Sequence, residues 1–206
     1  MCVDKAAGAE LRQLMKEVIE LEWQMFTNVQ NEGCRASCQD DQKTFEIMRG
    51  SQFAVWSKAA LESWECDLKE AGQSNRNLMA EKYAYMMADT APEQYEQLCH
   101  LLPEVSDGKR RLVEELTAKQ VGWREQAEKQ YPFLRQQGRV LRKSEAQAGD
   151  TSLETYASGE LLTYSVKTLE LLKSQFEEME EQGVNPGICI LEDMVRRYGY
   201  EDLNEA

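Results

Sequence analysis

The densest group of side chains that could do chemistry lies in residues 28–41, which read N-V-Q-N-E-G-C-R-A-S-C-Q-D-D. Short polar side chains compete with helical backbone hydrogen bonding, and therefore favour loops. Loops held by a rigid scaffold often carry binding residues. We therefore expect this segment, the polar hinge, to cover a ligand pocket. Its candidate ligand-binding residues are Asn28, Asn31, Arg35, Ser37, Cys38, Gln39, Asp40 and Asp41.

Four segments with helical apolar spacing each carry one polar residue inside the apolar stripe, at about 100° per residue. These residues are Glu22, Lys82, Gln120 and Glu160. Burying an unpaired charge costs several kcal/mol, so each charged member needs a partner or a function. Pairing of Glu22 with Lys82 is the simplest expectation, and Arg35 is an alternative partner for Glu22. The four predict either the polar floor of a pocket beneath the hinge or a buried ion-pair network.

A second candidate is a basic cluster in an otherwise acidic chain, whose net charge is −13. The cluster lies within residues 133–150, a segment without helical spacing. Its cations could bind a phosphate, a carboxylate or an acidic partner, although a solvated mobile loop is an alternative. The anion-binding candidates are Arg135, Arg139, Arg142 and Lys143.

Metal sites have weaker support in the sequence. Cys34 and Cys38 form a single C-x-x-x-C without the accompanying ligands of a zinc site. The one histidine is His100, and the residue three positions before it is Gln97 rather than a glutamate. The chain therefore lacks the Glu-x-x-His motif of di-iron bundles. We assign no metal site, no catalytic residue and no cofactor.

Two further patterns remain as alternatives. Cys38 precedes a predicted helix start, which lowers a thiol pKa, but the neighbouring Asp40 and Asp41 oppose that effect. A helical nucleotide pyrophosphohydrolase, a metal-dependent hydrolase, holds its metal with clustered acids on adjacent helices. Four acids of this chain match that pattern only loosely. The acids concerned are Glu17, Glu20, Glu192 and Asp193.

Helical spacing almost everywhere predicts an all-α, single-domain bundle of about seven or eight helices around a long central helix. The domain would span residues 1–206, with residues 1–8 frayed and residues 133–150 forming a long loop. The central helix is expected at residues 152–182, apolar nearly all round and started by a capping box at T-S-L-E, residues 151–154. The other predicted caps include Asp40 or Asp41, Ser57, Ser74 and Ser106.

The composition restricts the function classes. A net charge of −13 disfavours nucleic-acid and anionic-membrane surfaces, which require clustered cations. No apolar run reaches the ~20 residues of a membrane helix, and the first residues lack the pattern of a signal peptide, so a cytoplasmic location is expected. Single cysteines are then expected as buried thiols, namely Cys2, Cys66, Cys99 and Cys189.

Three strings carry a resemblance to known sequences: R-A-S-C-Q-D-D-x-x-T-F-x-I-M-R-x-S-Q-F at residues 35–53, N-L-x-x-E-K-Y-x-x-M-M at 77–87, and E-T-Y-x-x-G-E-L-x-T-Y-S at 154–165. The chain resembles a bacterial family of unknown function over nearly its whole length, up to Y-G-Y at residues 198–200. The resemblance implies no activity. The strings contain part of the hinge, Lys82 and Glu160, whereas Cys34 lies outside them.

The sequence thus predicts a protein that binds a small polar or anionic ligand in a pocket beneath the polar hinge. An adaptor or accessory subunit that acts through protein contacts is the first alternative. The metal-dependent hydrolase is the second.

Overall fold

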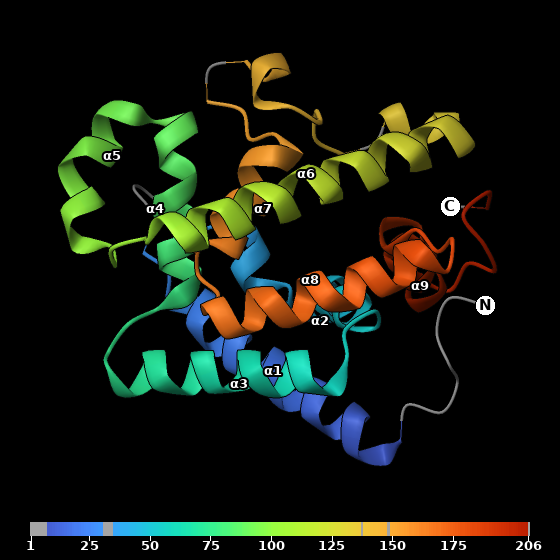
Figure 1. Cartoon of the computed structure of the whole chain (residues 1–206), viewed down its shortest axis with the longest axis horizontal. Coiled ribbons are helices and arrows are strands. Elements are labelled where there is room, and N and C mark those ends of the chain that lie inside the picture. Colours follow the sequence, from blue (N-terminus) through green and yellow to red (C-terminus); the bar gives the residue numbers. More distant parts are fainter. Residues whose placement is uncertain (1–7, 31–34, 137, 148, 206) are drawn as a thin grey trace. The chain divides into compact units, whose positions relative to one another are not determined.

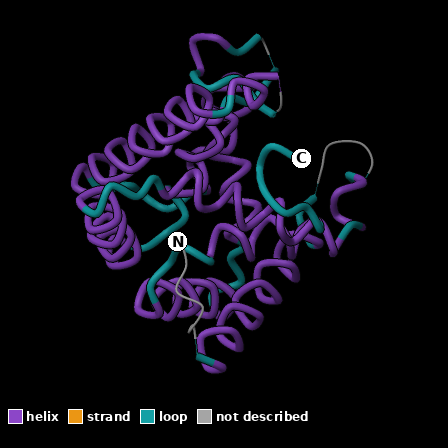
Figure 2. Tube along the Cα trace, turned by 90° about the vertical axis from the view of Figure 1, so that its right-hand side faces the viewer, coloured by secondary structure: helices purple, strands orange, loops and turns teal. Residues whose placement is uncertain are grey.

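Helices make up the regular structure in the computed structural model of this chain, which describes residues 8–30, 35–136, 138–147 and 149–205. No strand occurs among these residues, as Figure 2 shows, and the all-α prediction is confirmed. The nine α-helices of this part of the chain are α1 (Ala9–Thr27), α2 (Gln42–Phe53), α3 (Lys58–Gln73), α4 (Leu78–Thr90), α5 (Pro92–Leu98), α6 (Asp107–Gln130), α7 (Leu153–Leu161), α8 (Val166–Glu181) and α9 (Pro186–Tyr198). Four 3-10 helices accompany them: η1 (Ser37–Asp40), η2 (Cys99–Leu101), η3 (Pro132–Gln136) and η4 (Lys143–Glu145).

The chain divides into two compact units. Unit 1 comprises Met1–Ala80 and Leu171–Ala206, and unit 2 comprises Glu81–Glu170. Both boundaries fall inside a helix, α4 and α8 respectively (Figure 1). The single domain expected over residues 1–206 stays a prediction.

Capping side chains set three helix starts where the sequence predicts them. The side chains of Asp41, Ser57 and Ser106 each accept a hydrogen bond from the backbone N–H three residues later, at 3.0, 3.2 and 3.2 Å. The predicted cap at Ser74 is wrong. Asn77 begins α4 instead, because its Oδ1 accepts from two backbone N–H groups while its Nδ2 donates to the carbonyl of Met25.

The predicted long helix over residues 152–182 is also wrong, because the chain leaves helical geometry between α7 and α8. The Thr163 hydroxyl donates to the Glu160 carbonyl at 2.7 Å, and the Ser165 hydroxyl accepts from the N–H of Thr168 at 3.2 Å. Hydroxyl side chains that bond the backbone locally stop one helix and cap the next. The apolar residues that surround a single expected helix therefore belong to two helices.

The start of α7 differs from the expected capping box by one residue. The Ser152 hydroxyl, fully buried, accepts from the N–H of Thr155 at 3.0 Å. The carboxylate of Glu154 instead accepts from the backbone N–H of Lys143 at 2.9 Å. Glu154 therefore ties η4 to α7, and part of the expected loop over residues 133–150 is held by the helix that follows it.

In unit 1, α1 packs against α2 and α3, and α2 packs against α9. The core of this unit includes Trp64, Leu61 and Phe53, which are all buried. In unit 2, α6 packs against α7. Gly159 permits a close approach of α7 to α4, since a Cβ at this position would lie 2.5 Å from Cγ of Met86.

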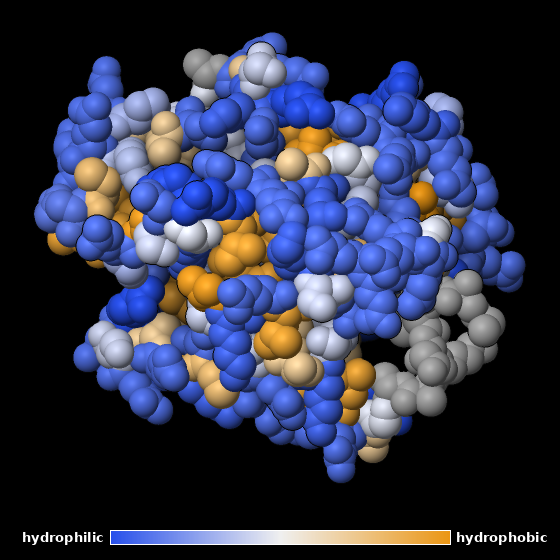
Figure 3. Space-filling view, viewed as in Figure 1, coloured by the Kyte–Doolittle hydropathy of each residue, from blue (hydrophilic) through white to orange (hydrophobic). Residues whose placement is uncertain are grey.

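Hydrophilic residues cover most of the face drawn in Figure 3, and hydrophobic residues gather near its centre. Among the described residues, no helix combines the length and hydrophobicity that crossing a bilayer requires.

Candidate functional site

The described part of the polar hinge binds the carboxyl end of α1. The buried Gln39 side chain donates from Nε2 to the carbonyls of Phe26 and Val29, at 2.9 and 3.0 Å. Arg35 donates from Nη1 to the carbonyl of Thr27 at 2.8 Å. The last carbonyls of a helix lack intrahelical partners, so these two side chains complete the end of α1.

Other side-chain bonds fix the hinge itself. Arg35 pairs with Asp40 at 2.8 Å, and the Gln39 Oε1 accepts from the N–H of Ala36 at 3.1 Å. Asp41 caps α2, and the hydrogen bond from the backbone of Thr44 lowers the pKa of its carboxyl. Side-chain hydrogen bonds therefore hold residues 35–41 in place. Asn31 and Cys34 lie outside the described residues.

Glu22 is fully buried in unit 1, as the helical spacing predicts. Its carboxylate accepts from Nε and Nη2 of Arg49, both at 2.6 Å, and from the indole N–H of Trp64 at 2.8 Å. The predicted partners, Lys82 and Arg35, are wrong for Glu22. A two-pronged guanidinium contact satisfies both carboxylate oxygens, which makes burial of the charge tolerable.

Lys82 and Glu160 form a second buried pair, in unit 2, where they are 4% and 4% exposed. The Lys82 ammonium lies 2.5 Å from the Glu160 carboxylate and 3.6 Å from the ring centroid of Tyr156. Tyr164 donates its hydroxyl to the same carboxylate at 2.8 Å. Burial is thus confirmed for three of the four predicted inward groups, whereas Gln120 is only half-buried.

Sequence reasoning missed Arg49, although the rule that found Glu22 also applies to it. Arg49 lies four residues from both Phe45 and Phe53 on α2, within an apolar stripe. Helical spacing shows that a polar group faces inward, but it does not show which distant segment supplies the partner.

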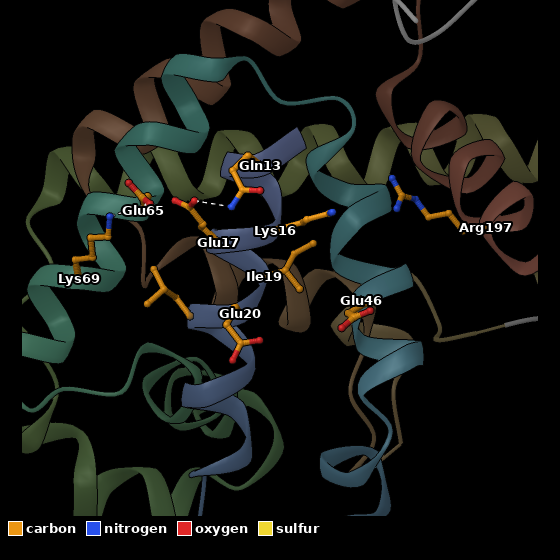
Figure 4. A pocket seen from close by; sticks show the side chains of 10 residues that line it. Gln13, Lys16, Glu17, Ile19, Glu20, Glu46, Glu65, Lys69 and Arg197 are labelled. Atoms are coloured by element: carbon orange, nitrogen blue, oxygen red, sulfur yellow. Dashed lines mark hydrogen bonds and ion pairs between the residues drawn. The ribbon is translucent and has the colours of Figure 1, made fainter. Parts of the chain in front are cut away.

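A first hollow, the α1 groove, lies in unit 1 and has a volume of about 740 Å³. Figure 4 shows Glu17 of α1 turned toward Glu65 and Lys69 of α3, while Lys16 and Arg197 approach α2 from opposite sides. The hydrogen bond to Glu65, within an ion pair at 2.8 Å, raises the pKa of Lys69. The groove is lined by Gln13, Lys16, Glu17, Ile19, Glu20, Leu21, Glu46, Glu65, Lys69 and Arg197.

A second hollow of unit 1, about 610 Å³, lies between the carboxyl ends of α1 and α3 and shares Leu21 and Lys69 with the groove. It includes one hinge candidate, Asn28, whose Nδ2 donates to the carbonyl of Gln24 at 2.8 Å. The hinge therefore reaches this hollow only through the residue at its beginning.

The third hollow, the α6–α7 pocket, lies in unit 2 and encloses about 270 Å³. One face of α6 forms its wall, because each lining residue of this helix lies three or four positions from another one. The end of α4, η4 and α7 complete it. The lining residues are Asp89, Arg110, Val113, Glu114, Thr117, Ala118, Val121, Arg142, Lys143, Glu154, Ser158 and Leu162.

Several contacts hold the elements of the α6–α7 pocket together. Lys109 of α6 donates to the carbonyl of Leu162, at the end of α7, at 2.7 Å. Lys143 pairs with Asp89 at 3.5 Å, and Arg142 pairs with Glu125 at 2.6 Å. The hydrogen bond to Glu125 raises the pKa of Arg142. The pocket is therefore assembled by protein contacts before any ligand binds.

One buried polar atom of this pocket has no partner. Thr117 is 6% exposed, and its hydroxyl makes no hydrogen bond with the described residues. An unsatisfied buried hydroxyl costs about 1–3 kcal/mol, and a threonine side chain can rotate its hydroxyl toward an acceptor. Thr117 is the only described side chain with such an atom.

The four anion-binding candidates of the predicted basic cluster have different surroundings. Arg142 and Lys143 line the α6–α7 pocket, together with Arg110, which the sequence analysis missed. Arg139 lies over the Tyr156 ring at 5.2 Å and donates to the carbonyl of Thr151. Arg135 is exposed on η3.

The remaining hinge candidates lie outside the linings of these three hollows. Cys38 is exposed. The predicted burial of single cysteines is confirmed for Cys189 and wrong for Cys66 and Cys99, which are exposed on helix surfaces. Cys2 lies outside the described residues.

The acids of the hydrolase alternative have different surroundings. Glu17 and Glu20 line the α1 groove, where each accepts a hydrogen bond from a glutamine amide. Glu192 and Asp193 instead pair with the arginines four residues later on α9. Among the described residues, no group of three or more potential ligand residues could hold a metal ion.

Comparison with known proteins gives one family. Residues 12–206 match the family described as "Protein of unknown function (DUF4125)". No curated protein and no solved structure matches the chain.

Proposed function

The chain therefore belongs to this family of unknown function, and we propose that it binds a small anionic ligand in the α6–α7 pocket. The observation that carries the proposal is the unpartnered Thr117 hydroxyl in the lining of a charged pocket. A ligand oxygen would give this hydroxyl the acceptor that the protein does not provide.

Three cations favour a ligand that carries a negatively charged group, namely Arg110, Arg142 and Lys143. Arg142 and Lys143 already share their charge with carboxylates. Arg110 makes no ion pair with any described residue, and is therefore the cation most available to a ligand. A guanidinium binds carboxylate and phosphate oxygens in a two-pronged geometry.

The size of the pocket limits the ligand. A volume of 270 Å³ lies just below the range of roughly 300–1,000 Å³ that is common for small-molecule sites. This volume suits a phosphate or a short carboxylic acid. We propose that this activity belongs to the cytoplasm, as the sequence analysis expects.

The proposal moves the predicted ligand from the polar hinge to unit 2. The side chains of Arg35, Gln39 and Asp41 already bind the protein backbone, so they are engaged in completing α1 and α2. In contrast, the Arg110 guanidinium makes no ion pair, and the Thr117 hydroxyl makes no hydrogen bond, with the described residues.

The test is thermal unfolding with inorganic phosphate, sulfate and a set of short carboxylates, at constant ionic strength. A ligand at 100 times its Kd adds ~2.7 kcal/mol to the free energy of unfolding, which raises the Tm by several degrees. We expect at least one anion to raise the Tm of the wild-type protein. Arg110→Ala should abolish the rise.

The matched control is Arg111→Ala, since Arg111 is an exposed arginine on the same helix outside the pocket lining. This variant should keep the rise in Tm. Equal responses from the two variants would overturn the proposal. So would the absence of any response of the wild-type protein to small molecules that carry a carboxylate, phosphate or sulfate group.

A further inference from the structure

The lining of the α6–α7 pocket carries as many carboxylates as cations. Asp89, Glu114 and Glu154 oppose the three basic residues. A ligand with negative charge alone would therefore meet repulsion as well as attraction.

Most of these carboxylates have protein partners. Asp89 accepts from the Thr155 hydroxyl at 2.9 Å and pairs with Lys143, while Glu154 accepts from the Lys143 backbone. Glu114 makes no ion pair and no side-chain hydrogen bond with the described residues. It is thus the negative counterpart of Arg110.

Arg110 and Glu114 lie one turn apart on the pocket face of α6. A pair of opposite charges at this spacing could form an ion pair, but arginine placed before glutamate is the less favourable order. Thr117 follows on the next turn of the same face. One helix therefore presents a cation, a carboxylate and an unpartnered hydroxyl in succession.

We infer that the ligand is a small zwitterion, a free amino acid, with its carboxylate on Arg110 and its ammonium on Glu114. The inference rests on the proposed anion-binding function of this pocket. The pocket volume of about 270 Å³ lies just below the range of roughly 300–1,000 Å³ that is common for small-molecule sites. This size favours the smaller amino acids.

The experiment compares three forms of each small amino acid by thermal unfolding and calorimetric titration: the free form, the N-acetyl derivative and the carboxamide. The first derivative removes the ammonium and the second removes the carboxylate. We expect the free form to bind at least tenfold more tightly than either derivative. Glu114→Gln should reduce its affinity by at least tenfold, whereas it should not weaken any effect of inorganic phosphate on the Tm, because the substitution removes a repulsive charge.

The control for Glu114→Gln is Glu96→Gln, at an exposed position of α5 outside the pocket lining, which should bind like the wild-type protein. If the N-acetyl form binds as tightly as the free form, or Glu114→Gln leaves the affinity unchanged, the zwitterion is wrong and the anion site stands. The same holds if phosphate or sulfate binds and no amino acid does. If none of the anions or amino acids binds, the proposed function fails together with this inference.

Discussion

Two kinds of buried polar residue occur in this protein, and they differ in what surrounds them. Glu22, Lys82 and Glu160 have charged partners at 2.5–2.6 Å, while Thr117 has no partner among the described residues. A satisfied group stabilises its surroundings, whereas an unsatisfied one costs free energy until something binds it. We therefore expect substitutions at the two kinds of residue to have opposite effects on stability.

The first prediction concerns Thr117. Replacing it with valine keeps the shape of the side chain and removes the unsatisfied hydroxyl, so we expect the ligand-free protein to gain up to about 1 kcal/mol in stability. The same variant should bind the pocket ligand more weakly. Chemical denaturation and titration together measure both effects. A variant that loses stability in the absence of ligand would show that the hydroxyl already has a partner.

The second prediction concerns the Glu22–Arg49 pair. Arg49→Met removes the cation that binds the buried Glu22 carboxylate, and should destabilise unit 1 by about 3–5 kcal/mol. The double variant Glu22→Leu with Arg49→Met should recover much of this loss, although the Trp64 indole N–H then lacks its acceptor. Urea denaturation of the single and double variants measures the coupling. Additive losses would exclude a shared energetic role.

Among the secondary-structure elements, the polar hinge connects the carboxyl end of α1 to the amino end of α2. Gln39 and Arg35 complete the end of α1, and Asp41 caps the start of α2. Side chains of this polar segment thus bond the backbone, which is a different role from lining a pocket. The sequence pattern is the same in both cases, because turns and binding sites use the same residue types.

The cap at α2 predicts a pH dependence. The hydrogen bond from the Thr44 backbone lowers the pKa of Asp41 below its ordinary value of 3.8. The stabilising contribution is therefore fully present above pH 3.8 and is lost as the pH falls through the lower pKa of the folded state. An asparagine side chain at this position would cap the helix without titrating, so the stability difference between wild type and Asp41→Asn should change only in this acidic range. The measurement is urea denaturation of both proteins at a series of pH values, and a difference that stays constant through the acidic range would contradict this assignment.

For the whole molecule, local signals predicted much of the fold. Ser57 and Ser106 mark helix starts because an N-cap bond involves residues only three positions apart. The inward positions of Glu22 and Lys82 each follow from the apolar spacing of the helix that carries the residue, α1 and α4 respectively. The partner of Glu22 lies 27 residues away, and that of Lys82 lies 78 residues away. No local pattern contains such pairings.

The pocket shows the same limit. Arg142 and Lys143 stand out as basic residues in an acidic chain, but Arg110 and Thr117 are ordinary members of a long helix. Only the packing of α6 against α7 shows which face of that helix lines a hollow. The proposed binding site thus depends on contacts between distant segments, which the sequence does not show.

The order of the elements has a consequence for synthesis on the ribosome. Unit 2 is one continuous stretch, Glu81–Glu170, whereas unit 1 combines Met1–Ala80 with Leu171–Ala206. A chain leaves the ribosome with its amino end first, and domains generally fold as units. Unit 2 is therefore fully synthesised before α9, the packing partner of α2, has emerged. During this interval α2 lacks its packing partner α9, including the contact between Gly50 and Arg197. The nascent chain then presents an apolar surface of the kind that chaperones bind.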